Sequence, residues 1–174
     1  MSDTTTRPQI LVPQILVAGI GNIFLADDAF GVEVAQRLAG ESLPDGVTVI
    51  DYGIRGLHLA YDLRDNDYDL VIFLDALPRG DEPGTVYLFE PDTSFERDEV
   101  DVDAHEMHPL AVLALLADLG GEVRRLLVVG CEPAELEERI GLSPAVAVAV
   151  DKAVQVVGEL LENEMSALVA GKET

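Results

Sequence analysis

The chain is poor in residue types that mark several common classes of protein. It has one cysteine, Cys131, so it can form no internal disulfide. It has two lysines, Lys152 and Lys172, and 11 basic residues against 33 acidic ones, a formal net charge of −22. Nucleic-acid binding needs clustered basic residues, and anionic membrane surfaces repel acidic proteins. We therefore expect no nucleic acid and no membrane among its partners. The acidity serves solubility, and it would also steer a basic peptide segment toward a cleft.

Long apolar runs and targeting signals are also missing. The most continuous apolar stretch, 143–161, is broken by Asp151, Lys152 and Gln155, and a membrane span needs roughly 18 or more apolar residues. The N-terminus lacks the charged-then-apolar order of a signal peptide. We therefore expect a cytoplasmic protein, and a monomer, because no heptad or repeat indicates assembly.

A length of 174 residues, 48% of them hydrophobic, suits one globular domain with its own core. The segment PQILV occurs twice, at 8–12 and 13–17, and only the second copy runs into a glycine turn. Proline cannot donate to a β-ladder, so both copies cannot be central strands. We predict a flexible leader over 1–13 and a single α/β domain over 14–170.

Apolar runs alternate with helical periodicities along this domain. Continuous apolar runs suit strands that are covered on both faces. Apolar residues at i, i+4 and i+8, closed by Gly40, indicate a helix, as do Pro109 and the Ser143–Pro144 pair at helix starts. The predicted strands are 15–20, 47–50, 70–74, 85–89 and 126–129, and the predicted helices are 28–39, 57–63, 109–119 and one that begins after Ser143.

The connection ALPRGDEPG after the third strand is too short for a crossover helix, so Thr85–Phe89 should return as an antiparallel edge strand. The expected fold class is therefore α/β: a three-layer sandwich with a mostly parallel twisted sheet of about five strands, one antiparallel edge strand, and helices on both faces. The acidic stretch 90–106 is either a solvated loop or a flap over a site. The helix from Pro109 is apolar on nearly every side, which predicts that it is buried.

Acidic residues follow four of the predicted strands. Because ligands bind beyond the carboxyl ends of parallel strands, these residues should line one edge of the sheet. They are Asp27 and Asp28, Asp51, Asp75, and Glu132. Which of them meet depends on strand order, which the sequence does not give. Strands one and three flank the centre in common doubly wound layouts, so we expect Asp28 and Asp75 to form the pair.

The three histidines are candidates for a mixed metal site. His58 falls within a predicted helix and is expected to be a surface or packing residue, whereas His105 and His108 precede the helix at Pro109. Two carboxylates and one imidazole suit nickel, zinc or manganese, although strand-end carboxylates are often structural. A thiol protease built on Cys131 and His105 is an alternative, but lone cysteines at such positions are usually inert.

Other catalytic signatures are missing. The sequence has no HExxH helix, no GxSxG elbow and no Walker loop. The GIGN turn departs from the dinucleotide fingerprint because Phe24 stands where the third glycine should be. Gly19 and Gly21 instead indicate a tight turn after the first strand, in which Asn22 tolerates an unusual backbone conformation.

Four segments together resemble the hydrogenase maturation proteases. They are GIGNIFLADDAFGVEVAQRL (19–38), VIFLDAL (71–77), HEMHPLAVLALL (105–116) and VVGCEP with IGLSP (128–144). The resemblance covers nearly the whole chain from the first strand onward, with the motifs in the family's order and spacing. The G-x-G-N start, followed by two acidic residues and a Gly-Val helix, is the most specific of them.

The resemblance implies that Asp28, Asp75 and His105 form a nickel-sensing site, with Asp28 and Asp75 catalytic and Asp27 supporting the turn. It implies an endopeptidase that removes the C-terminal extension of the nickel–iron hydrogenase large-subunit precursor after nickel insertion. The nickel would then be supplied by that substrate rather than held permanently. A metal-polarised carbonyl or a metal-bound water are alternative ways to cleave the bond.

One loop departs from the family pattern. Family members often carry D-G-G-T-x-G after the second strand, and this chain has DYGIRG at 51–56. We assign substrate binding to Asn22, Gly53 and Gly56, and Arg55 places a rare cation near the acidic edge. The rival interpretations are a non-catalytic nickel-binding chaperone of hydrogenase assembly, a nucleotide-binding α/β domain, and a purely structural partner protein.

Overall fold

A computed structural model describes residues 11–92 and 109–173. Its sheet has five strands in the order β2-β1-β3-β5-β4. Four strands are parallel, and β4 pairs antiparallel with β5 at the edge. The strands are β1 (Ile15–Ile20), β2 (Val47–Gly53), β3 (Leu70–Ala76), β4 (Val86–Phe89) and β5 (Leu126–Cys131). The expected sheet with one antiparallel edge strand is confirmed.

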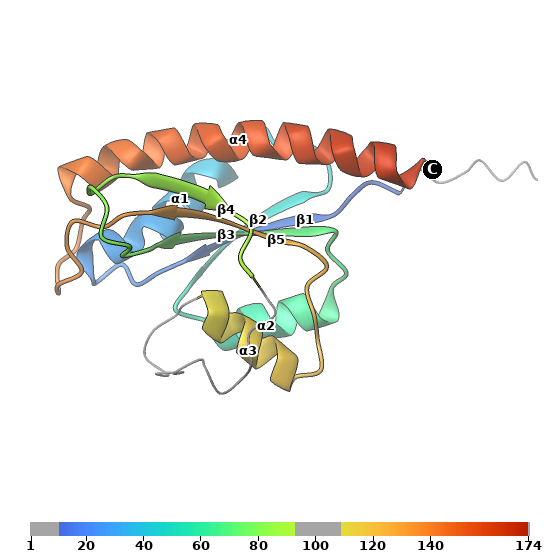
Figure 1. Ribbon diagram of the computed structural model, residues 1–174, viewed down its shortest axis with the longest axis horizontal. Helices are drawn as coiled ribbons and strands as arrows, with labels where there is room; N and C mark the ends of the chain where they lie inside the picture. Colours follow the sequence, from blue (N-terminus) through green and yellow to red (C-terminus); the bar gives the residue numbers. More distant parts are fainter. Residues whose placement is uncertain (1–10, 93–108, 174) are drawn as a thin grey trace, which may run out of the picture.

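Helices cover both faces of the sheet, as Figure 1 shows. Two helices, α1 (Phe30–Ala39) and α4 (Pro144–Lys172), pack on one face, and α2 (Gly56–Asp65) and α3 (Pro109–Asp118) pack on the other. Each face therefore has its own apolar core. The three central strands β1, β3 and β5 are buried along their whole length, which explains why their sequences are apolar without alternation.

The long helix α4 begins where the sequence predicts. The hydroxyl of Ser143 accepts a hydrogen bond from the backbone N–H of Val146 at 3.4 Å, and Pro144 is the first helical residue. The helix buries one apolar stripe against the sheet, made of Val146, Ala149, Val150, Ala153, Val157 and Leu161. None of the helices within 11–92 and 109–173 is long and apolar enough to cross a membrane.

Glycines let α1 approach the sheet closely. A Cβ on Gly31 would lie 2.0 Å from the carbonyl oxygen of Leu74 and 2.4 Å from that of Ile20. A Cβ on Gly19 would lie 2.5 Å from the carbonyl oxygen of Gly31. The start of α1 therefore lies directly on β1 and β3, and this close contact explains the Gly-Val helix of the sequence motif.

Two expectations are corrected. Helix α3 buries Val112 and Leu116, but Leu113 and Leu115 stay half-buried, so it is not covered on every side. Asn22 does not take the unusual backbone conformation, because the positive φ angles of this turn belong to Gly21 (150°) and Ala26 (49°). Ala26 begins the short 3₁₀ helix η1 (Ala26–Ala29), which leads into α1.

Candidate active site

The carboxyl ends of β1 and β3 bring two acidic residues together. Asp75 is the penultimate residue of β3 and its side chain is buried, with a relative exposure of 2%. Asp28 lies in η1 after β1 and is half-buried. Since β1 and β3 are neighbours in the sheet, Asp28 lies close enough to Asp75 for its negative charge to act on the Asp75 carboxyl.

This coupling is unfavourable for two charged carboxylates. Burial, and then the negative charge of Asp28, raise the pKa of Asp75 well above its usual value, and the backbone N–H of Ala76 offsets only part of the effect. Without a cation, Asp75 is therefore driven toward its protonated form. A positive charge beside the pair would reverse this and favour both carboxylates in their ionised state.

The turn after β1 orients Asp28. The backbone N–H of Asn22 donates to Oδ2 of Asp28 at 2.8 Å. The side-chain oxygen of Asn22 accepts from the backbone N–H of Phe24 at 2.9 Å, which closes a small turn. Asn22 therefore has a structural role in holding Asp28, and its predicted role in substrate binding stays a prediction.

Asp27 has a larger part than the sequence indicated. It is fully buried and accepts hydrogen bonds from the backbone N–H groups of Ala134, Glu135 and Ser143, and from the Ser143 hydroxyl, at 2.7–3.1 Å. Burial would raise the pKa of Asp27, but these hydrogen bonds together lower it below its usual value. Asp27 thus joins η1 to the β5–α4 loop and to the start of α4.

The other acidic residues at this edge have different partners. Asp51, at the end of β2, accepts from the Gln36 amide at 3.2 Å. Glu132, after β5, accepts from the backbone N–H groups of Arg79 and Gly80 and from the Tyr87 hydroxyl, at 2.8–3.1 Å. Burial would raise the pKa of Glu132, but its hydrogen bonds lower it. Glu132 therefore fixes the β3–β4 connection rather than joining the Asp28–Asp75 pair.

A cavity of about 320 Å³ opens between the loops that follow β1 and β2. Gly53 lines it, has a φ of 56° that favours glycine, and its carbonyl accepts from the N–H of Gly21 at 3.0 Å. Of the departures from the family loop, Ile54 and Arg55 line the cavity and are exposed. Tyr52 also borders it, but is 1% exposed and donates its hydroxyl to Asp62 at 2.7 Å.

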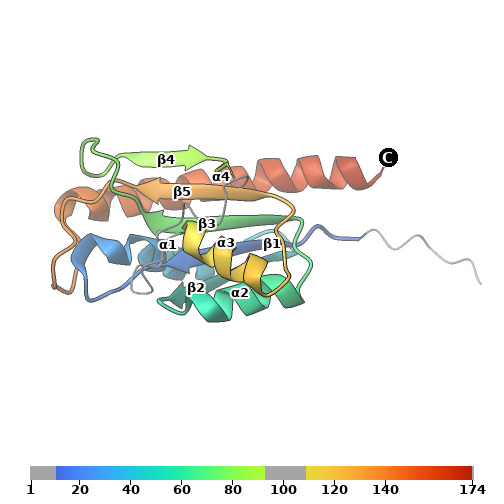
Figure 2. The same cartoon turned by 60° about the horizontal axis from the view of Figure 1, so that its bottom comes forward.

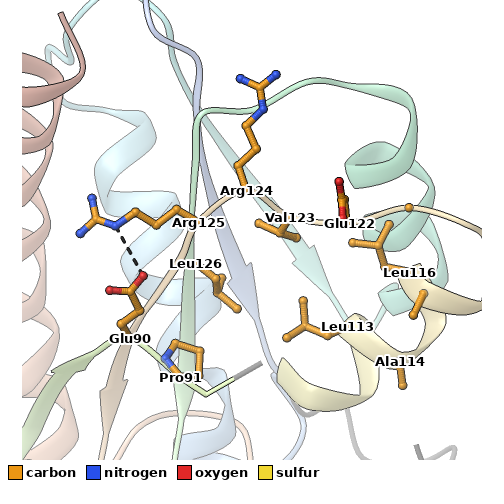
Figure 3. Close-up of a pocket in the computed structure, with 12 residues that line it drawn as sticks. Glu90, Pro91, Leu113, Ala114, Leu116, Glu122, Val123, Arg124, Arg125 and Leu126 are labelled. Atoms are coloured by element: carbon orange, nitrogen blue, oxygen red, sulfur yellow. Dashed lines mark ion pairs between the residues drawn. The ribbon is translucent and has the colours of Figure 1, made fainter. Parts of the chain in front are cut away.

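A larger cavity of about 370 Å³ lies elsewhere. Figure 3 shows it between α3 and the start of β5, where Leu113 and Leu126 face it and Arg125 pairs with Glu90 at 3.6 Å. None of the acidic residues at the carboxyl ends of β1, β2, β3 and β5 borders it. The larger cavity therefore lies away from the candidate active site.

The remaining candidate residues are the three histidines and Cys131. His105 and His108 lie outside the described residues, as does most of the acidic stretch 90–106. His58 is a surface residue of α2, with its Nε2 atom 3.7 Å from Asp62, as expected. Cys131 is fully buried, and burial raises the pKa of its thiol to about 12, so it is a poor nucleophile. The thiol-protease alternative is thereby disfavoured.

The donor set at this edge suits a divalent metal only in part. Among the described residues, no group of three or more metal-ligating side chains occurs, so Asp28 and Asp75 provide two carboxylates. A cation beside the two carboxylates would relieve their mutual repulsion, and an imidazole would complete a mixed oxygen and nitrogen set. This geometry defines a class of protein: doubly wound α/β proteins that carry a pair of carboxylates beyond the carboxyl ends of their parallel strands.

The comparisons with known proteins give the family. The hydrogenase maturation protease model matches residues 32–160. The hydrogenase 2 maturation protease of Escherichia coli is 32% identical over 158 residues, covering 89% of this chain and 95% of that protein. A hydrogenase expression/formation protein of Rhizobium leguminosarum is 34% identical over 156 residues, covering 83% of this chain and 74% of that protein.

Solved structures agree. A hydrogenase maturating endopeptidase from E. coli superposes with a TM-score of 0.70 at 32% identity, covering 87% of this chain and 93% of that one. A hydrogenase 2 maturation peptidase from a Thaumarchaeota archaeon gives 0.64 at 30% identity, covering 85% and 97%. The chain belongs to the hydrogenase maturation protease family, and it is a peptidase of hydrogenase maturation.

Proposed function

We propose that this peptidase removes the C-terminal extension of a nickel–iron hydrogenase large-subunit precursor after nickel has been inserted. Nickel is part of the substrate in this proposal, and Asp28, Asp75 and His105 recognise it. The observation that carries the proposal is the buried Asp75 beside Asp28, whose pKa is raised by burial and by the Asp28 charge. Such a pair is stable in its ionised form only when a cation approaches it.

The site distinguishes nickel-loaded from nickel-free precursor through this charge. Without nickel, burial and the negative charge of Asp28 favour the protonated form of Asp75. The two carboxylates, with His105, would hold the nickel that the substrate carries. That nickel would supply Lewis-acid chemistry toward the scissile carbonyl or an attacking water. The protein's own residues orient the substrate, with Asn22 holding Asp28 and with Asn22, Gly53 and Gly56 contacting the peptide.

The protein acts in the cytoplasm as a monomer in this proposal. Its substrate must reach a partly buried carboxylate pair at one edge of the sheet, and a monomer leaves that edge accessible. The cavity between the β1 and β2 loops is the place in this proposal where the C-terminal extension binds.

The first test is the intact mass of the large subunit in cells that lack this protein. We expect the subunit to keep its extension, and wild-type protein to restore trimming. Asp75→Ala should fail to restore it, since losing several kcal/mol of transition-state stabilisation lowers kcat/KM by about 100-fold or more. Asp45→Ala is the matched control, because Asp45 lies before the amino end of β2, whereas Asp75 lies at the carboxyl ends of the strands.

The nickel-binding chaperone is the rival hypothesis. It uses the same three ligands, but it leaves the length of the large subunit unchanged. Normal trimming in the deletion strain, with no second protease to account for it, would favour the chaperone and contradict the peptidase assignment of the site. If the deletion strain does not trim the subunit and the Asp75→Ala protein restores trimming in full, the proposed role of Asp75 is contradicted. The peptidase function is not contradicted by that result.

A further inference from the structure

Exposed apolar side chains gather around the active site. Most large apolar residues of the described chain are buried, and those that are not buried include five from three loops at the carboxyl edge of the sheet. Their relative exposures run from 39% for Leu136 to 74% for Ile140. We call this set the apolar belt: Ile23, Phe24, Ile54, Leu136 and Ile140.

The loops that carry the belt adjoin one another. Ile23, Phe24 and Ile54 line the same cavity. The carbonyl of Phe24 accepts a hydrogen bond from the N–H of Arg139 at 3.0 Å, which places Ile140 next to Phe24. Figures 1 and 2 show the loops after β1 and β5 side by side at one end of the sheet. The belt thus borders the Asp28–Asp75 pair, because the Asn22 turn that carries Phe24 also holds Asp28.

The loops that carry the belt are firmly held. Ala26 donates to the carbonyl of Arg139 at 2.8 Å, Asp27 donates to that of Glu135 at 3.2 Å, and Gly21 donates to that of Gly53 at 3.0 Å. The side chains of the belt are therefore presented by a fixed backbone. Apolar groups exposed on a rigid frame lose little entropy on binding, and they are typical of contact surfaces with another protein.

The charges around the belt indicate its partner. Arg139 pairs with Glu135, and Arg55 donates to the backbone carbonyls of Tyr52 and Asp51, so both arginines are used within their own loops. Glu137 and Glu138 are exposed and have no ion-pair partner among the described residues. The belt is thus an apolar surface with an acidic margin on a chain of net charge −22. Its complement is an apolar patch with a Lys- or Arg-rich margin.

We propose that the apolar belt docks the folded body of the hydrogenase large-subunit precursor, through an apolar patch bordered by basic residues on that subunit. This inference rests on the proposed function for the identity of the partner. Docking of the body then places the C-terminal extension against Asp28 and Asp75. Affinity comes from the belt, whereas bond cleavage depends on the carboxylate pair.

The test measures binding separately from cleavage. Asp75→Ala protein binds nickel-loaded precursor without turnover, and Phe24→Glu or Ile140→Glu on that background should raise Kd by about 10-fold or more. Leu88→Glu is the matched control, because Leu88 is 49% exposed on β4, outside the belt, and should change Kd by less than about 2-fold. Thermal melting confirms that each variant is folded.

Charge is tested in the same assay. Glu137→Lys with Glu138→Lys should weaken binding several-fold, and the loss should shrink at high salt. Glu41→Lys changes the charge at the far end of α1 and should leave Kd unchanged. Equal losses for Glu41→Lys and the margin variants would mean general steering by net charge, and would contradict a basic margin at the belt.

The outcomes separate this inference from the proposed function. Normal cleavage with an unchanged KM in Phe24→Glu and Ile140→Glu would overturn the belt and leave the peptidase function intact. The protein could instead bind the precursor and never cleave it, and the belt variants could abolish that binding. This result would support the belt as a docking surface and contradict the proposed function. Concentration-dependent dimerisation that Phe24→Glu abolishes would assign the belt to a second copy of this chain instead.

Discussion

At the scale of single residues, Asp75 is placed where it destabilises the folded protein. A buried carboxylate next to a second one loses hydration and is repelled by the charge of its neighbour. Its pKa is raised in the fold and ordinary in the unfolded chain, so the folded state binds more protons between these two values. Stability contributed by protonated Asp75 is present at low pH and is lost as the pH rises through that window.

We therefore expect Asp75→Asn to stabilise the metal-free protein at neutral pH while it abolishes peptidase activity. The gain should be about 1 kcal/mol, a rise in Tm of roughly 2–4 °C. It should shrink as the pH falls and vanish well below the ordinary pKa of 3.8, where Asp75 is protonated in both states. Calorimetry in chelator-treated buffer at both pH values measures it. If Asp75→Asn leaves Tm at pH 7 unchanged or lowers it, the two carboxylates do not destabilise the fold of the metal-free protein.

At the scale of elements, the active-site turn depends on a loop more than 100 residues away. Asp27 connects η1 to the β5–α4 loop, and the hydroxyl of Ser143 both donates to Asp27 and caps α4. The folded-state pKa of Asp27 is lowered, so its stabilising effect is full above the ordinary value of 3.8 and is lost as the pH falls through the folded value.

Asp27→Asn should therefore lower the free energy of unfolding by roughly 2–3 kcal/mol at pH 7, because hydrogen bonds to a charged acceptor are lost. The difference from wild type should shrink below pH 3.8. If Asp27 also positions Asp28, kcat/KM measured well below Tm should fall about 10-fold. Asp151→Asn is the control, because the exposed Asp151–Arg37 pair contributes little. Equal effects of the two substitutions would contradict the role of Asp27.

At the scale of the whole molecule, the net charge of −22 is large for 174 residues. Like charges spread over one small surface repel one another and weaken the compact state. The acidity that favours a basic partner therefore also reduces stability at low ionic strength.

Raising NaCl from about 10 mM to about 300 mM at pH 7 should increase Tm by a few degrees, because the Debye length falls from roughly 30 Å to below 10 Å. At pH 5, nearer the isoelectric point of about 4.1, the gain should be smaller. Differential scanning fluorimetry at both pH values measures this. A Tm that falls with added salt would show that surface ion pairs such as Arg124–Asp67 outweigh the repulsion.

The elements could be predicted from the sequence because their signals are local. Strands covered on both faces are continuous apolar runs, and Ser143 with Pro144 is a sufficient start signal for α4. Every predicted strand and helix within the described residues is present, with ends shifted by up to three residues at β2. The family and the acidic residues of the site also followed from local motifs.

The relation between those acidic residues could not be read from the sequence. Asp27 and Asp28 are adjacent and chemically identical, yet Asp27 is enclosed by the β5–α4 loop and Asp28 couples to Asp75. Glu132 follows a strand just as Asp75 does, but it holds the β3–β4 connection. Strand order and loop hydrogen bonds decide these partners, because they depend on contacts between residues that are distant along the chain. The sequence by itself determined the fold class and the family, and the tertiary structure decided which charges meet.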